Sequence, residues 1–103
     1  MALSVKEGVD LRLLVPQMAV AIVVVDQVCS ELGVGCVITS GRDSKHSDES
    51  FHYLGAGLDF RTRELDQQTA KVLEHRVSQR LGSQWDVVFE GDHLHVEFDP
   101  PRV

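Results

Sequence analysis

Two short stretches of this chain combine residue types that can hold a metal ion. The first places an imidazole at His52 and a carboxylate at Asp59, seven residues further on. The second, Asp92-His93-Leu94-His95, adds another carboxylate and two more imidazoles. A catalytic zinc ion takes three protein ligands from His and carboxylate side chains and leaves a fourth position open. Together, the two stretches could supply one zinc site.

The spacing within each stretch decides which side chains can meet. His52 and Asp59 can both point inward if the segment between them bends, and Gly55 and Gly57 give the backbone that freedom. The third ligand must then come from the second stretch. Its two histidines lie two residues apart on a predicted strand and so face the same side of the sheet. The residues alone leave both histidines as candidates for the third ligand.

Two helices are predicted from apolar spacing and terminal residues. The first begins at Pro16, whose missing N–H is harmless in the first turn, and ends at Gly33 as C-cap. Apolar residues recur at every third or fourth position over 18–32, as on the buried side of a helix. The second helix is predicted to follow Thr62 as N-cap and to end at Gly82.

Short β-branched or alternating runs predict the strands, and a turn signal at Glu90-Gly91-Asp92 joins the last two as a hairpin. The predicted strands cover 36–39, 58–60, 85–89 and 94–98. The polar run 41–50 predicts a surface loop, and residues 1–15 are left open between a helical turn and an extended segment. This order indicates an α+β fold with two helices packed on a small, mostly antiparallel sheet.

Length and charge narrow the class of protein. A chain of 103 residues with 43% hydrophobic residues indicates one globular domain over 1–103. The net charge of -6 argues against a nucleic-acid binder, which needs clustered cations. The apolar run at 18–25 is far shorter than the ~20 residues of a membrane span, and no signal peptide is recognisable. We therefore expect a monomer made in the cytoplasm, without a membrane span.

Four further residues of reactive type are given less weight. Cys29 and Cys36 lie among apolar neighbours without a CxxC spacing, so two buried free thiols are expected, with a local disulfide as the alternative. His75 is expected to be an exposed polar residue of the second helix. His46 is expected to be an exposed loop histidine, with substrate contact as its alternative.

The first stretch resembles the SxHxxGxAxD signature of the D-Ala-D-Ala metallopeptidases. That family includes zinc D,D-carboxypeptidases, D,D-dipeptidases of the vancomycin-resistance type and phage L-alanyl-D-glutamate endopeptidases. Ser50, His52, Gly55, Gly57 and Asp59 occupy the signature positions, with Gly57 where alanine is usual. The resemblance implies a hedgehog/D,D-peptidase fold and one zinc ion per chain, bound in part by His52 and Asp59. It also implies that Ser50 supports the His52 loop by a hydrogen bond.

The second stretch resembles the other motif of the family, an acidic residue followed three positions later by the last zinc-binding histidine. The resemblance makes His95 the third ligand and Asp92 the general base that takes a proton from the attacking water. Many members carry Glu where Asp92 stands. His93 is a rival for a catalytic role, because the first histidine of an HxH pair is catalytic in the wider lysostaphin-like group.

The segment Thr39-Ser40-Gly41-Arg42 is similar to the one that carries the arginine of the family. The implied role of Arg42 is to hold the substrate carbonyl or carboxylate as charge develops. The alternative is a surface arginine paired with Asp43 or Asp48.

The resemblance implies a zinc peptidase that hydrolyses an amide bond in the peptide part of bacterial peptidoglycan, as a D,D-carboxypeptidase or an L-Ala-D-Glu endopeptidase. It would act on the cell wall, after release by a phage lysis system, with a bacterial housekeeping peptidase as the alternative. The alternative is a non-catalytic binding module of the same fold that keeps the zinc, as hedgehog signalling domains do. An acid at the base position, Asp92, favours the enzyme.

Overall fold

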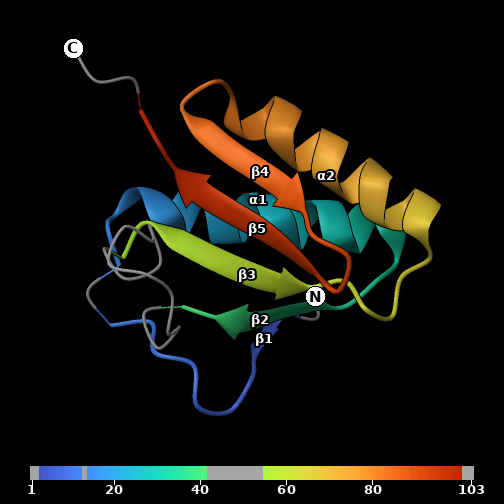
Figure 1. Cartoon of the computed structure of the whole chain (residues 1–103), viewed down its shortest axis with the longest axis horizontal. Helices are drawn as coiled ribbons and strands as arrows, with labels where there is room; N and C mark the ends of the chain where they lie inside the picture. Colours follow the sequence, from blue (N-terminus) through green and yellow to red (C-terminus); the bar gives the residue numbers. More distant parts are fainter. Residues whose placement is uncertain (1–2, 13, 42–54, 101–103) are drawn as a thin grey trace.

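The computed structural model describes residues 3–12, 14–41 and 55–100. Within them, five strands and two helices form an α+β fold. The elements follow one another as β1 (Leu3–Val5), α1 (Gln17–Leu32), β2 (Cys36–Ser40), β3 (Gly57–Arg61), α2 (Gln67–Leu81), β4 (Trp85–Phe89) and β5 (His93–Phe98). The strands make one sheet, and both helices contribute to a single core against the same face of it (Figure 1).

The sheet is mixed, with its strands in the order β1-β2-β3-β5-β4. β1 pairs with β2 in parallel, whereas the other three neighbouring pairs are antiparallel. The predicted α+β class, with two helices on a mostly antiparallel sheet, is therefore confirmed. The segment at 1–15 that the sequence left open supplies the edge strand β1. The loop predicted at 41–50 lies outside the described residues from position 42 onward.

Helix α1 begins and ends close to the predicted positions. Pro16 is its N-cap and Gly33 its C-cap, and Gly33 has the left-handed conformation (φ 70°) that glycine adopts without strain. The run of β-branched residues at 22–25 is helical, because the periodic apolar side of the helix packs into the core. The residues of α1 that are buried there include Met18, Val25 and Cys29.

Helix α2 begins later than predicted, and Thr62 is not its N-cap. Asp66 caps the helix instead, because its carboxylate accepts a hydrogen bond from the Thr69 backbone N–H at 2.7 Å. Thr62 is buried just after β3, where its hydroxyl donates to the Gly91 carbonyl at 3.2 Å. Its backbone N–H donates to the Asp92 carbonyl. Threonine and aspartate can both cap a helix. Here Thr62 instead holds the β4–β5 turn against the end of β3.

Strands β3 and β5 have two chemically different faces. Leu58 and Phe60 on β3 and Leu94 and Val96 on β5 are buried against the helices and form the centre of the core. Residues in between alternate to the other face, as the period of two in a strand requires. Asp59 was predicted to point away from its apolar neighbours on β3, and the alternation bears this out.

The two cysteines are buried and not linked by a disulfide, as predicted. Cys29 comes from the last turns of α1 and Cys36 from the start of β2. A hydrogen bond with Cys29, together with burial, raises the pKa of the Cys36 thiol. Because both side chains are buried, we assign this pair to the core.

No helix within residues 3–12, 14–41 and 55–100 is long and apolar enough to cross a membrane. The apolar run at 18–25 belongs instead to α1, which packs on the sheet (Figure 1).

Candidate metal and catalytic site

The face of the sheet opposite the helices gathers the charged and imidazole side chains of β3 and β5. Asp59 is the direct cross-strand partner of His95, and Arg61 is the partner of His93. Asp59 and His95 are 36 residues apart in the sequence. Their side chains are in contact because the two strands are antiparallel neighbours. The sequence prediction that His93 and His95 share one face is confirmed by this register.

The His95 ring lies between two carboxylates. Its Nδ1 is 2.9 Å from Asp59 Oδ1, and its Nε2 is 2.9 Å from Glu97 Oε1. The three side chains are largely enclosed, with exposed fractions of 15% for His95, 10% for Asp59 and 17% for Glu97. Burial lowers the pKa of His95, but the hydrogen bonds to both carboxylates outweigh it and raise the pKa to about 9. With both ring nitrogens protonated, each N–H donates to a carboxylate.

The same three side chains could serve a metal ion, with one of them as an outer partner. A ligating histidine commonly donates its second ring N–H to a carboxylate, which fixes the tautomer and the ring orientation. Glu97 makes that contact at Nε2, which leaves Nδ1 and the Asp59 carboxylate facing one another. The two side chains fit as two adjacent zinc ligands, one nitrogen and one oxygen.

His93 forms a second contact network at the edge of this site. Its Nδ1 donates to Asp92 Oδ1 at 2.6 Å, whereas its Nε2 is 3.6 Å from Glu90 Oε1 and 3.9 Å from Asp59 Oδ1. The hydrogen bond from His93 lowers the pKa of Asp92. The Asp92 carboxylate is therefore held in its ionised form beside the imidazole.

The backbone around Asp92 is fixed, although its side chain is 76% exposed. Its carbonyl accepts from the Thr62 N–H and its N–H donates to the Glu90 carbonyl. Gly91, before it, has a φ of 84°, a conformation that glycine adopts more readily than other residues. The turn thus holds the Asp92 backbone next to the end of β3, with the carboxylate exposed.

The remaining predicted site residues lie outside the described part of the chain. His52, the first predicted zinc ligand, and Arg42, the predicted oxyanion-stabilising arginine, belong to residues 42–54, as do Ser50 and His46. Among residues 3–12, 14–41 and 55–100, no group of three or more His, Cys, Asp or Glu side chains is arranged to hold a metal ion. Two of the three predicted ligands, Asp59 and His95, do lie together, and the complete zinc set stays a prediction.

The sequence analysis missed Glu97. The signal for it was present, because Glu97 follows His95 by two residues and a strand returns to the same face at that interval. Its cross-strand partner is Gly57. The residue opposite Glu97 thus has no side chain.

A polar pocket of about 240 Å³ opens beside Asp59 and His93. Its lining also includes Lys6, which follows β1, and Arg61 at the end of β3. The remaining lining residues are Thr39, Arg63 and Asp92. The pocket is thus continuous with the candidate site and adds cations to it.

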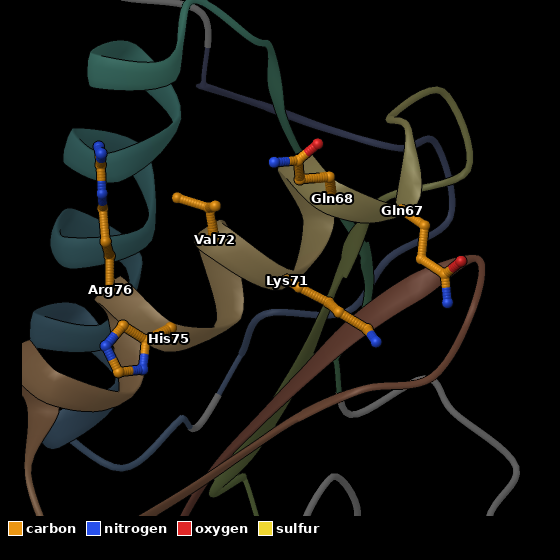
Figure 2. A pocket seen from close by; sticks show the side chains of 6 residues that line it. All are labelled: Gln67, Gln68, Lys71, Val72, His75 and Arg76. Carbon is orange, nitrogen blue, oxygen red and sulfur yellow. The ribbon is translucent and has the colours of Figure 1, made fainter.

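A larger hollow of about 530 Å³ lies on α2, away from these residues. Figure 2 shows Arg76, Val72 and Gln68 on the side of α2 toward α1, and Lys71 and Gln67 on the other side. His75, which also lines it, is exposed as predicted. The described residues that line it include one imidazole and no carboxylate, so the chemistry favours the site on β3 and β5.

The chain matches no protein-family model, and a search of the curated proteins found no matching relative.

Proposed function

We propose that this chain is a zinc-dependent peptidase of the hedgehog/D,D-peptidase fold. Its reaction would be hydrolysis of an amide bond in the peptide part of bacterial peptidoglycan, of the D,D-carboxypeptidase or L-Ala-D-Glu endopeptidase type. The observation that carries the proposal is the 2.9 Å contact between Asp59 and His95, two residues taken from separate sequence motifs. A structural salt bridge could produce the same contact, but it would not explain the two motifs around it.

His52, Asp59 and His95 would hold the zinc ion. When bound, zinc would polarise the scissile carbonyl and lower the pKa of a water molecule. Glu97 would keep the His95 ring oriented through Nε2, so that Nδ1 stays turned toward the metal position.

Asp92 would act as the general base. Its lowered pKa keeps it ionised, so it can accept a proton from the attacking water and pass it to the leaving amine. The His93 imidazole, bonded to Asp92 at 2.6 Å, would orient this carboxylate or stabilise the developing oxyanion. Arg42 would add a cation for the same oxyanion. The proposed substrate and the family resemblance support the cell wall as the site of action.

The direct test is the metal content of the purified protein, measured by native mass spectrometry after zinc is added back. We expect about one zinc per chain, and none in His52→Ala or His95→Ala. Absence of zinc in the parent protein would contradict the proposal. A zinc-loaded protein would next be incubated with defined muropeptides, and the product masses would identify the bond that is cleaved.

The same assays separate an enzyme from a zinc-containing binding module. In an enzyme, Asp92→Ala should keep the zinc and lose hydrolysis. A parent protein that binds zinc but releases no product from any muropeptide would instead favour the binding module.

A further inference from the structure

A buried carboxylate and two buried thiols come together where α1 ends and β2 begins. Asp26 and Cys29 are three residues apart on α1, so both side chains lie on one side of the helix. Cys36 is the first residue of β2. The exposed fractions are 4% for Asp26, 3% for Cys29 and 1% for Cys36. None of these residues belongs to the site on β3 and β5, so the group needs an explanation of its own.

The two thiols are in contact, because the Cys36 thiol donates a hydrogen bond to the sulfur of Cys29. The chain turns back tightly between them, with the Val34 N–H donating to the Cys29 carbonyl at 2.9 Å. Two sulfur atoms in contact need only approach further to form a disulfide, whose S–S bond is about 2.05 Å long. The fold therefore holds the pair ready for oxidation.

The hydrogen bond makes the two thiols chemically unequal. It lowers the pKa of Cys29, against burial and the negative charge of Asp26, which both raise that pKa. The same hydrogen bond, together with burial and the charges of Cys29 and Asp26, raises the pKa of Cys36. The thiolate is the nucleophilic form of cysteine. Cys29 is thus suited to react first, while Cys36 keeps its proton until Cys29 has reacted.

Asp26 supplies a base beside the pair. Among residues 3–12, 14–41 and 55–100, its Oδ1 is the one buried side-chain polar atom without a hydrogen-bond partner. Such an atom costs free energy, and a redox or catalytic role is one reason for a protein to keep it. The charge of Asp26 acts on both thiols. Its Oδ1 therefore has the capacity to accept the proton that Cys36 loses when a disulfide forms.

A short exposed connection leads to the buried thiols. Residues 33–35 join α1 to β2, and both glycines in this connection are exposed. Helix ends and exposed connections open locally at a much lower free energy than the whole fold. Opening here would uncover Cys29, in the last turn of α1, to a small molecule before a bulky one. A small oxidant is therefore the reactant that fits this site.

We propose that Cys29 and Cys36 form a redox-active dithiol that a small hydroperoxide converts into a disulfide, with Asp26 as the proton acceptor for Cys36. Hydrogen peroxide is the simplest oxidant of this class. The inference does not depend on the proposed function, because none of the three residues takes part in the peptidase site.

The reaction has two steps. In the first, the Cys29 thiolate attacks the peroxide, so that an S–O bond forms, the O–O bond breaks and the hydroxide that leaves becomes water. In the second, Cys36 gives its proton to Asp26 and attacks the Cys29 sulfur. The S–S bond forms, the S–O bond breaks, and the leaving hydroxide takes the proton from Asp26. The two thiols are oxidised by two electrons, and one hydrogen peroxide is reduced to two water molecules.

The test adds hydrogen peroxide to the purified, reduced full chain. Remaining thiols are alkylated after the reaction, and the intact mass is measured. We expect both thiols to disappear together with the loss of two hydrogen atoms, and dithiothreitol to restore them. Circular dichroism should show that the oxidised protein is folded. Thiols that stay reduced, or that gain oxygen without forming the disulfide, would overturn the proposal.

The reaction must also take place in the folded protein, because an unfolded chain exposes both cysteines. The rate of disulfide formation is therefore compared with the rate of global unfolding, measured by urea jumps and extrapolated to water. We expect disulfide formation to rise with the peroxide concentration and to exceed the unfolding rate. A rate that stops at the unfolding rate, however much peroxide is added, would mean that only unfolded chains react.

Two serine variants assign the order of the thiols. Cys36→Ser keeps a hydrogen-bond donor beside Cys29 but has no second sulfur, so dimedone should trap the sulfenic acid on Cys29. Cys29→Ser should give the adduct on Cys36 at least about tenfold more slowly, as for a thiol whose pKa lies one unit higher. A faster adduct on Cys36 would overturn the assigned order.

Asp26→Asn separates the two steps, with circular dichroism as the check on folding. Loss of the negative charge favours the Cys29 thiolate, so dimedone trapping in Asp26→Asn/Cys36→Ser should be as fast as in Cys36→Ser or faster. Disulfide closure at saturating peroxide should slow by about 10²-fold in Asp26→Asn, since the amide cannot accept the proton. Asp99→Asn, an exposed change after β5, should alter neither step. Closure as fast in Asp26→Asn as in the parent, or a loss shared by both steps, would overturn the role of Asp26.

Discussion

Asp59 and His95 are direct partners across β3 and β5, and Asp59 Oδ1 lies 2.9 Å from His95 Nδ1. Both residues are held by backbone hydrogen bonds of the sheet, with buried Leu58, Phe60, Leu94 and Val96 on either side of them in sequence. The pair is therefore positioned by the core rather than by a loop. A rigid support of this kind preorganises metal ligands.

The first prediction concerns this pair. Asp59→Asn removes one anionic ligand and should abolish zinc binding, because a neutral amide is a poor substitute for a carboxylate at this ion. Native mass spectrometry gives the zinc content, and circular dichroism checks that the fold is kept. His75→Ala is the control, since this exposed histidine on α2 should not affect the metal. Full zinc occupancy in Asp59→Asn would show that the aspartate is not a ligand.

The second prediction concerns Glu97, which contacts the other nitrogen of the same ring at 2.9 Å. Glu97→Gln keeps the shape of the side chain but removes the charge that orients the imidazole and raises its basicity. Zinc affinity, measured by competition with a chelator, should fall by about 10- to 100-fold. Glu64→Gln, an exposed change in the loop before α2, should leave the affinity unchanged. If both variants bind zinc as the parent does, Glu97 has no part in holding His95.

The third prediction separates proton transfer from metal binding. Asp92→Asn should keep zinc but lower kcat by about 10²- to 10⁴-fold, since the amide cannot accept the proton. Asp99→Asn, on the exposed segment after β5, should retain full activity. His93→Ala removes the 2.6 Å partner of Asp92 and should lower kcat less. A larger loss in His93→Ala than in Asp92→Asn would assign the base to His93.

The sheet and its polar face could be predicted because they depend on local patterns. Alternation around Asp59 fixed which face it occupies, and the two-residue spacing of His93 and His95 placed them on one side. The helix ends at Pro16 and Gly33 also follow from rules that involve only neighbouring residues. For these elements, tertiary packing agreed with local preference.

The features that the sequence did not predict depend on strand pairing. Nothing local places Lys6 near Arg61, because β1 reaches the pocket through its parallel pairing with β2. Thr62 and Asp66 are both acceptable caps, and the choice was decided by the Gly91 carbonyl, which takes the Thr62 hydroxyl. Glu97 is the exception, because its spacing of two residues from His95 on one strand was a local signal that the sequence analysis overlooked.

The last prediction concerns the N-terminus of α2 and its dependence on pH. The hydrogen bond from the Thr69 backbone N–H, followed by that from its hydroxyl, lowers the pKa of Asp66 from its ordinary value of 3.8. Because the folded-state pKa is lowered, the ionised cap stabilises the fold above that ordinary value. The stabilisation is lost as the pH falls through the folded-state pKa.

Asp66→Ala removes this cap, and Asp66→Asn replaces it with a cap that does not titrate. At neutral pH, the alanine variant should unfold at a lower urea concentration than the parent, with the asparagine variant close to the parent. At an acidic pH below the ordinary value of 3.8, the gap between parent and Asp66→Ala should shrink, because the stabilisation by the ionised cap is lost as the pH falls toward the lowered folded-state pKa. The gap between the asparagine and alanine variants should change little. A parent-to-alanine gap that stays constant between the two pH values would mean that the charge of Asp66 does not stabilise α2.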